Sequence, residues 1–328
     1  MPTGRLEVFA YEDSFPAEYI GPFLQKYPRV EFVPVYYDTD GESLERVLSG
    51  YRPDVHGTCV EETLGRLIEL NRLQPLDTGR LPAWDRLHPV FRQLPGVTFE
   101  GRAYLAPVDS AATGLIYDTV RAPSRIESFA MLFGADLAGR IAIDAKPIIA
   151  IQIAALVLGF RDPYDLSSLQ LDAVRNFYVD LKQQGRFPIL WETHEDLARL
   201  YRDGTIVASS GFPGDTRVYQ QDGLKVEFVV AKEGPMLWAC GYALDAACRN
   251  VDAAYAFLNF VLDPESQAGL ATRLGFMVSN ADARFLVSPD VRRLALLDRP
   301  LALEGAILPR PASDPEAWRQ TWAAILDA

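Results

Sequence analysis

The sequence predicts a two-lobed α/β protein, and three observations support that prediction. The chain has 328 residues, too many for one typical hydrophobic core and about right for two domains of about 150 residues each. Short apolar segments alternate with helical patterns, which is typical of sheets built with crossover helices. No repeat, low-complexity tract or linker-like stretch divides the chain. We therefore expect discontinuous lobes: 1–112 with 241–285 in lobe 1, and 113–240 with 286–328 in lobe 2.

The first half of the chain alternates regularly between the two patterns. Residues 17–27 place Tyr19, Ile20 and Phe23 on one helical face, and Pro28 follows the expected end of that helix. Three prolines punctuate a loop-like stretch over 80–99. The strands expected in this half cover 6–10, 30–36, 53–57, 103–107, 113–117 and 139–143. The expected helices cover 17–27, 41–49, 61–70 and 148–158.

The second half continues the alternation with longer helices. Residues 169–183 are amphipathic, and Trp318 and Trp322 lie one helical turn apart in the tail. The strands expected here cover 205–208, 225–230 and 238–244. The expected helices cover 169–183, 192–202, 251–262, 264–274 and 314–326.

Charge and hydropathy exclude several classes of function. The chain carries 44 acidic and 32 basic residues, a net charge of −12, which argues against nucleic acid or an anionic membrane as a partner. No apolar run reaches the roughly 18 residues that a transmembrane helix needs. The first residues lack the pattern of a secretory signal. The protein is therefore expected to be periplasmic or extracellular if a signal precedes this sequence, and cytoplasmic if Met1 is the native start.

The three cysteines, Cys59, Cys240 and Cys248, do not form a recognisable framework. An odd count in a chain of this size indicates no disulfide scaffold, and the spacing matches no zinc pattern. We expect buried thiols that behave as small hydrophobic groups, and we expect neither a metal nor a cofactor.

Several short segments, weak alone, occur in an order that carries a family resemblance. They are Leu6–Tyr11, Pro53–Cys59, Leu73–Asp77, Ala103–Pro107, Thr113–Tyr117, and Lys232–Gly234 followed by Trp238. In this order the chain resembles the spermidine/putrescine-binding proteins of ABC transporters. The resemblance implies a type II periplasmic binding protein fold, with two mixed sheets flanked by helices, a ligand cleft at the hinge, and crossing strands near 111–113 and 240–242.

The resemblance also implies which residues contact the ligand, and here the match is incomplete. The aromatic and acidic group of the first strand falls on Tyr11, Glu12 and Asp13, and a later aromatic falls on Trp238. Other pocket positions of the family fall on residues of another kind: Ser110, Lys146, Ile149, Ser209 or Ser210, and Cys240. Each lost buried carboxylate would cost a polyamine roughly 2–5 kcal/mol of binding. We therefore expect a small polar ligand other than a classical polyamine, either anionic or zwitterionic.

Further candidates follow from local chemistry. Lys146 precedes Pro147 and a helix, so it lies beside a helix N-terminus, where anions are favoured. His56 and Cys59 lie where a strand enters a helix, and Asp109 lies just before the first crossing. All four are expected to line the cleft.

Three hypotheses of function remain open. The first is an extracytoplasmic solute-binding protein of an ABC importer, acting as a monomer with a permease and without catalytic residues. The second is a cytoplasmic enzyme on the same fold, in which Cys59 or Cys240 acts with His56 or Lys146. The third is a cytoplasmic ligand sensor, whose lobes close on a ligand and thereby signal to a partner protein.

Overall fold

The computed structural model describes the whole chain except Asp13 and residues 302–305. The chain forms two compact units. Unit 1 comprises Met1–Ala111, Trp238–Ala302 and Leu308–Arg310, and unit 2 comprises Ala112–Leu237, Leu303–Ile307 and Pro311–Ala328. Two unit boundaries fall inside strands, in β6 (Ala106–Asp118) and in β11 (Met236–Leu244).

The division of the chain differs from the expected one at several places. Residues 286–301, 308–310 and 238–240 were expected in the second lobe, whereas the structure assigns them to unit 1, and Ala112 is assigned to unit 2. For residues 286–301 the reason is packing, because Val291, Ala295 and Leu297 are buried in the hydrophobic core of unit 1.

The sheet of unit 1 has the strand order β2-β1-β3-β11-β6. Strand β1 (Gly4–Tyr11) pairs in parallel with β2 (Val30–Tyr37) and with β3 (Val55–Cys59). Strand β11 runs antiparallel to β3, and the short β12 (Met277–Val278) runs antiparallel to β6. The carboxyl ends of β1, β2 and β3 therefore share one edge, where ligands commonly bind in open α/β sheets.

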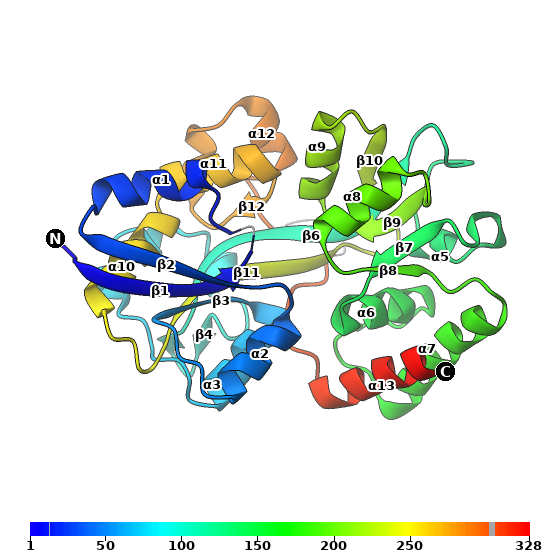
Figure 1. Ribbon diagram of the computed structural model, residues 1–328, viewed down its shortest axis with the longest axis horizontal. Coiled ribbons are helices and arrows are strands. Elements are labelled where there is room, and N and C mark those ends of the chain that lie inside the picture. Colours follow the sequence, from blue (N-terminus) through cyan, green and yellow to red (C-terminus); the bar gives the residue numbers. More distant parts are fainter. Residues whose placement is uncertain (13, 302–305) are drawn as a thin grey trace. The chain divides into compact units, whose positions relative to one another are not determined.

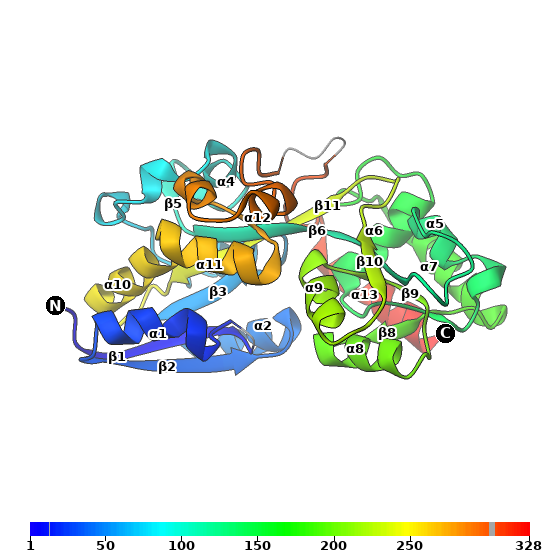
Figure 2. The ribbon, with the colours of Figure 1, turned by 90° about the horizontal axis from the view of Figure 1, so that it is seen from above.

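Helices cover both faces of this sheet (Figures 1 and 2). On one face α1 (Ala17–Lys26), α10 (Val251–Val261) and α11 (Pro264–Leu274) contribute to the core. On the other lie α2 (Asp40–Leu48) and α3 (Gly65–Glu69). Shorter elements of unit 1 are η1 (Val60–Leu64), η2 (Thr78–Arg80), η3 (Trp84–Arg86), α4 (Pro89–Arg92), β4 (Thr98–Phe99), β5 (Arg102–Ala103), η5 (Ala281–Phe285) and α12 (Pro289–Leu294).

Unit 2 contains a sheet of order β6-β9-β7-β8, with β10 also paired to β6. Its strands are β7 (Ile141–Asp144), β8 (Ile189–Trp191), β9 (Ala208–Gly211) and β10 (Val226–Val229). Its helices are α5 (Phe129–Leu132), η4 (Ala135–Leu137), α6 (Pro147–Val157), α7 (Ser168–Gln183), α8 (His194–Arg202), α9 (Pro213–Gln221) and α13 (Pro315–Asp327). Helices α6, α7 and α13 form one core, and α8 and α9 contribute to another on the opposite face of the sheet (Figure 1).

Most expected elements are present, and the differences have physical causes. The strands expected at 103–107 and 113–117 are mainly one long strand, β6, whose polar centre at Asp109 and Ser110 resembles a break. Helix α9 was missed because Pro213 and Gly214 are typical of a turn. In the structure Asp215 instead accepts a hydrogen bond from the Phe212 amide and caps the helix.

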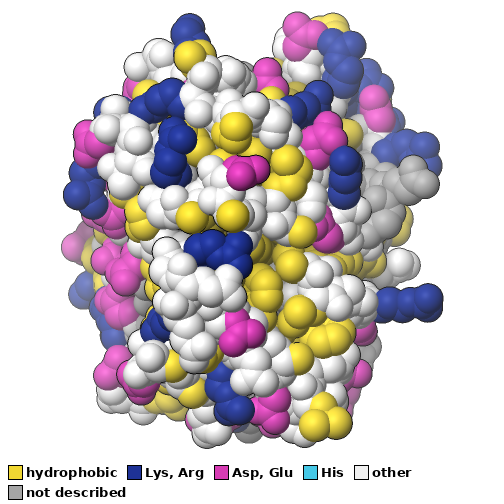
Figure 3. Space-filling model, turned by 90° about the vertical axis from the view of Figure 1, so that its right-hand side faces the viewer, with side chains coloured by type: hydrophobic (Ala, Val, Ile, Leu, Met, Phe, Trp, Pro, Cys, Tyr) yellow, Lys and Arg dark blue, Asp and Glu magenta, His cyan; other side chains and the backbone are white. Residues whose placement is uncertain are grey.

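The surface agrees with the charge pattern of the sequence. The face drawn in Figure 3 shows acidic, basic and apolar side chains intermixed. Within the residues that the structure describes, no helix is both long and apolar enough to cross a membrane.

Candidate functional site

Aromatic and acidic side chains meet at the carboxyl ends of the parallel strands of unit 1. The Tyr11 hydroxyl donates a hydrogen bond to Asp40 at the start of α2, and the ring centroids of Tyr11 and Tyr37 are 4.6 Å apart. Burial and the charges of Asp40 and Glu62 raise the pKa of Tyr11 well above its usual value. Tyr11 therefore stays a neutral donor that supports a carboxylate.

Two further carboxylates come from the π-helical turn η1, directly after β3. Glu61 is buried, and its Oε2 accepts a hydrogen bond of 3.3 Å from the Ala239 amide of β11. Burial, the charge of Asp40 and then the charge of Glu62 raise the pKa of both the Tyr11 and the Tyr37 hydroxyl. Trp238, beside Ala239, packs edge-to-face on Phe276 at 4.9 Å. This edge of unit 1 therefore offers three carboxylates and two partly exposed aromatic rings, Tyr11 and Trp238.

A disulfide joins the two strands that carry this group. Cys59 of β3 lies opposite Cys240 of β11 in the antiparallel ladder, and the two are bonded across a separation of 181 residues. The expectation of free thiols at these positions was therefore wrong. A disulfide sulfur is not a thiolate, so the enzyme hypothesis loses both of its proposed nucleophiles. Cys248 is a free thiol whose pKa burial raises to about 12, so it is not an activated nucleophile.

A second polar group lies at the carboxyl end of β7 in unit 2. Asp144 is 2% exposed and receives a hydrogen bond of 2.9 Å from the Lys146 amide through Oδ1, while its own amide donates to Ser210 Oγ at 2.9 Å. Its Oδ2 is buried with no hydrogen-bond partner. Burial raises the pKa of Asp144 to about 6, although the charge of Lys146 opposes the shift. A buried acceptor without a partner is uncommon outside functional sites.

A histidine and a second aspartate complete this group. His194, the first residue of α8, lies with its Nδ1 2.6 Å from Asp215 Oδ1, and its side chain is half exposed. The charges of both residues influence the Asp144 carboxyl. The indole of Trp191 is buried, and its ring centroid lies 6.1 Å from that of His194. Neither Trp191 Nε1 nor Thr216 Oγ1 has a hydrogen-bond partner, so the group includes two further unused polar atoms.

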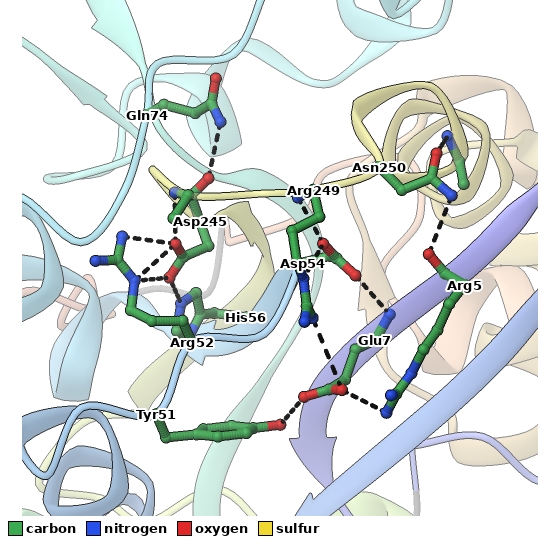
Figure 4. A network of polar contacts seen from close by, with 12 residues as sticks. Arg5, Glu7, Tyr51, Arg52, Asp54, His56, Gln74, Asp245, Arg249 and Asn250 are labelled. Atoms are coloured by element: carbon green, nitrogen blue, oxygen red, sulfur yellow. Dashed lines mark hydrogen bonds and ion pairs between the residues drawn. The ribbon is translucent and has the colours of Figure 1, made fainter.

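His56 belongs to a different network, at the opposite end of β3 in unit 1 (Figure 4). It is 1% exposed, and its Nε2 lies 2.8 Å from Asp245 Oδ2. Arg52 binds the same carboxylate, with Nη2 2.7 Å from Oδ1. Asp54 accepts hydrogen bonds from the amides of Glu7 and Arg249 nearby. The side chain of His56 is thus engaged in a buried hydrogen bond with Asp245, away from the carboxyl ends of the strands.

The remaining residues that the sequence predicted for the site differ in position and in burial. Glu12 is exposed just after β1, and Asp13 lies outside the described residues. Asp109 and Ser110 lie in the middle of β6, where Ser110 donates to the carbonyl of Trp238. Ser209 is fully buried and hydrogen-bonded to the Tyr201 hydroxyl at 2.8 Å. Among the described members of this set, Glu12 is exposed and Asp109 is partly exposed, whereas Ser110 and Ser209 are buried.

Comparisons with known proteins agree with this arrangement. A family model described as bacterial extracellular solute-binding protein matches residues 18–294, which is most of the chain. The chain belongs to the bacterial extracellular solute-binding protein family. This solute-binding protein is 26% identical over 287 residues to the putrescine-binding periplasmic protein PotF of Escherichia coli K12, a match that covers 80% of this chain and 75% of that protein.

Solved structures confirm the predicted fold of this solute-binding protein. A putative spermidine/putrescine ABC transporter from Listeria monocytogenes superposes with a TM-score of 0.85 at 20% identity, covering 98% of each chain. A GABA receptor superposes with a TM-score of 0.74 at 20% identity, covering 98% of this chain and 95% of the receptor. The fold is therefore that of the periplasmic binding proteins, as predicted.

Sequence reasoning missed several acidic residues of the solute-binding protein. Asp40, Glu61 and Glu62 follow strands β2 and β3, and strand ends were the available signal. Asp144 ends a strand two residues before Lys146, and Asp215 lies in the first turn of a helix. Each one resembles an ordinary capping or surface residue in the sequence, and only burial and shared neighbours distinguish it.

Proposed function

We propose that this solute-binding protein captures a small aliphatic zwitterion that carries one ammonium and one carboxylate group. The observation that carries the proposal is that the polar group of unit 1 is purely acidic, whereas the one in unit 2 includes the cation Lys146. In unit 1, Asp40, Glu61 and Glu62 form an acidic group beside aromatic rings. In unit 2, Lys146 lies at the N-terminus of α6.

The group in unit 1 suits the ammonium end of the ligand. Carboxylates form charge-assisted hydrogen bonds with an ammonium group, and aromatic faces attract cations. Tyr11 and Trp238 supply such faces, and Tyr11 also holds Asp40 in place through its hydroxyl. A ligand that is only anionic would be repelled here, which favours a zwitterion over a simple anion.

Lys146 suits the carboxylate end of the proposed ligand. An ammonium side chain next to the first turn of a helix favours a carboxylate and disfavours a second ammonium group. The matched proteins are compatible with either kind of ligand, a diamine or an amino acid, because one is named for putrescine and another for GABA. Both molecules carry an ammonium group on a four-carbon chain, and they differ in whether the far end is a second ammonium or a carboxylate. Lys146 favours the carboxylate.

This difference gives a sharp test with two ligands of equal length. Isothermal titration of the purified protein should show that GABA binds at least about 30-fold more tightly than putrescine, since one buried like-charge contact costs about 2 kcal/mol or more. Lys146→Met should weaken GABA binding by at least about tenfold without weakening putrescine binding. Lys182→Met, which alters a partly exposed lysine of α7 outside both polar groups, should change neither.

Two results would overturn the proposal in different ways. Tight binding of putrescine with no binding of GABA would show that the acids of unit 1 restore the polyamine function despite Lys146. Binding of neither compound, with a response to simple dicarboxylates instead, would show that no ammonium group is recognised. Glu62→Gln serves as the second variant, and it should weaken the binding of GABA and putrescine alike.

The proposed location is extracytoplasmic. PotF, the relative named above, is a periplasmic protein. Disulfides persist in oxidising compartments and are rare in the cytosol, so the Cys59–Cys240 bond supports the same location for this chain.

A further inference from the structure

Unit 1 carries an exposed apolar and basic face that the ligand hypothesis does not use. It is formed by η5, α12 and the segment up to Arg299, and we call it the α12 face (Figure 1, orange). Phe285 is 65% exposed, Leu286 52% and Leu294 51%. Large apolar side chains gathered on one surface segment are typical of a site that another molecule covers.

The α12 face is hollowed into a groove with a volume of about 520 Å³. Phe285, Val287, Pro289 and Leu296 supply its apolar lining. Its basic lining consists of Arg284, Arg292, Arg293 and Arg299, with Asp298 as its one carboxylate. Exposed aromatic rings, arginines and an apolar floor are the composition typical of the energetic centre of protein interfaces.

The arginines are held in position by local contacts. Arg292 binds Asp298 with Nε at 2.9 Å and 2.8 Å from the two carboxylate oxygens, and Arg293 pairs with Asp290 one helical turn earlier. The Arg284 guanidinium lies 4.7 Å from the centroid of the Phe285 ring, and its Nε is buried with no hydrogen-bond partner. Arg284 Nη1 also lies 4.0 Å from Asp298 Oδ1, so Asp298 positions both Arg284 and Arg292.

The charge of the α12 face is opposite to that of the whole chain. Residues 284–299 contain four arginines and two aspartates, whereas the chain carries a net charge of −12. A complementary partner therefore presents acidic and apolar side chains, and the local charge would steer it to this face. The inference rests on the proposed role of this chain in an ABC importer, because such an importer brings its solute-binding protein to a membrane-embedded permease and the protein then needs a docking surface.

We propose that unit 1 docks on the permease of its importer through the α12 face, and that an acidic, apolar extracytoplasmic segment of the permease occupies the groove. A lipid surface is a poorer match. The groove is concave, and its lining includes the carboxylate of Asp298, which anionic lipid head groups would repel. A protruding protein segment can enter the groove and reach Arg284.

Photocrosslinking tests the docking without knowledge of the ligand. A benzoylphenylalanine residue at position 285 replaces one exposed aromatic ring with another. In cells that make the complete importer, illumination should yield an adduct that mass spectrometry identifies as a permease subunit. The same residue at Phe99, which is 45% exposed in the same unit, is the matched control and should give no such adduct.

A competition experiment tests the role of charge. Added wild-type protein should reduce the adduct in membrane preparations, and Arg299→Glu protein should compete at least about tenfold less well. Arg102→Glu, an exposed arginine outside the face, should compete like wild type. Absence of the permease adduct, equal crosslinking from position 99, or equal competition by Arg299→Glu would overturn the proposal. So would sedimentation of the protein with anionic phosphatidylglycerol vesicles that Arg299→Glu abolishes, because the face would then bind lipid.

Discussion

At the scale of single residues, the most unusual group is the Asp144 carboxyl. It lies at the end of β7, almost fully buried, with one oxygen bound to the Lys146 amide and the other without a hydrogen-bond partner. Burial raises its pKa to about 6, so near neutral pH the folded protein keeps an ionised carboxylate in an unfavourable place. Buried ionisable groups with shifted pKa values are common at functional sites, where a ligand supplies the missing partner.

The pKa of Asp144 predicts how stability depends on pH. Because the folded pKa lies above the ordinary value of 3.8, the folded state binds the proton more tightly than the unfolded chain. This group therefore lowers the free energy of unfolding as the pH rises from about 4 to about 7, by roughly 3 kcal/mol in total. Asp144→Asn keeps an acceptor for the Lys146 amide and removes the titration.

Denaturant unfolding of wild type and Asp144→Asn at several pH values measures this effect. The Asn variant should gain stability relative to wild type as the pH rises through 5 and 6, and the two should converge near pH 4. Parallel curves over the whole range would show that Asp144 titrates normally in the folded protein.

At the scale of elements, the disulfide joins β3 to β11 where each strand continues into residues of the acidic group. Cys59 precedes the turn that bears Glu61 and Glu62, and Cys240 follows Ala239, whose amide binds Glu61. Gly241 is needed beside it, since a Cβ there would lie 2.2 Å from the Ala106 carbonyl oxygen of β6. The disulfide therefore fixes both the ladder and the base of the acidic turn.

Reduction of this bond should destabilise the protein. It closes a loop across 181 residues, and the chain-entropy model gives at most about 5 kcal/mol for a loop of this length. A reducing agent should lower the melting temperature of wild type by several degrees and leave a Cys59→Ala/Cys240→Ala double variant unchanged. Cys248→Ala is the matched control and should respond to reduction like wild type. An unchanged melting temperature of wild type under full reduction would contradict the structural role.

At the scale of the whole molecule, charge and surface together predict a monomer. A net charge of −12 makes copies of the chain repel one another, and the positive α12 face is small by comparison. Light scattering during gel filtration should give the monomer mass of 36.5 kDa at micromolar concentrations. A dimer that Phe285→Ala dissociates would contradict this prediction. It would also assign the α12 face to a second copy of the chain, with Phe99→Ala as the control.

The sequence by itself determined the fold class and several elements of the site. Alternating strands and helices without a linker predicted discontinuous lobes, because hydrophobic periodicity is a local property that short segments already contain. Lys146 was predicted at a helix N-terminus, where Pro147 does begin α6. Tyr11 was predicted at the end of the first strand, and the structure places it there.

Only the tertiary structure decided which distant residues meet. Cys59 is bonded to Cys240 across a separation of 181 residues. Tyr11 is hydrogen-bonded to Asp40 across 29 residues, and His56 to Asp245 across 189. These pairings depend on strand order and on register, and a shift of one residue would turn each side chain to the other face of the sheet. The charge of the candidate site, the loss of the thiol nucleophiles and the burial of His56 all follow from such long-range contacts. For that reason the local sequence predicted the scaffold but not its chemistry.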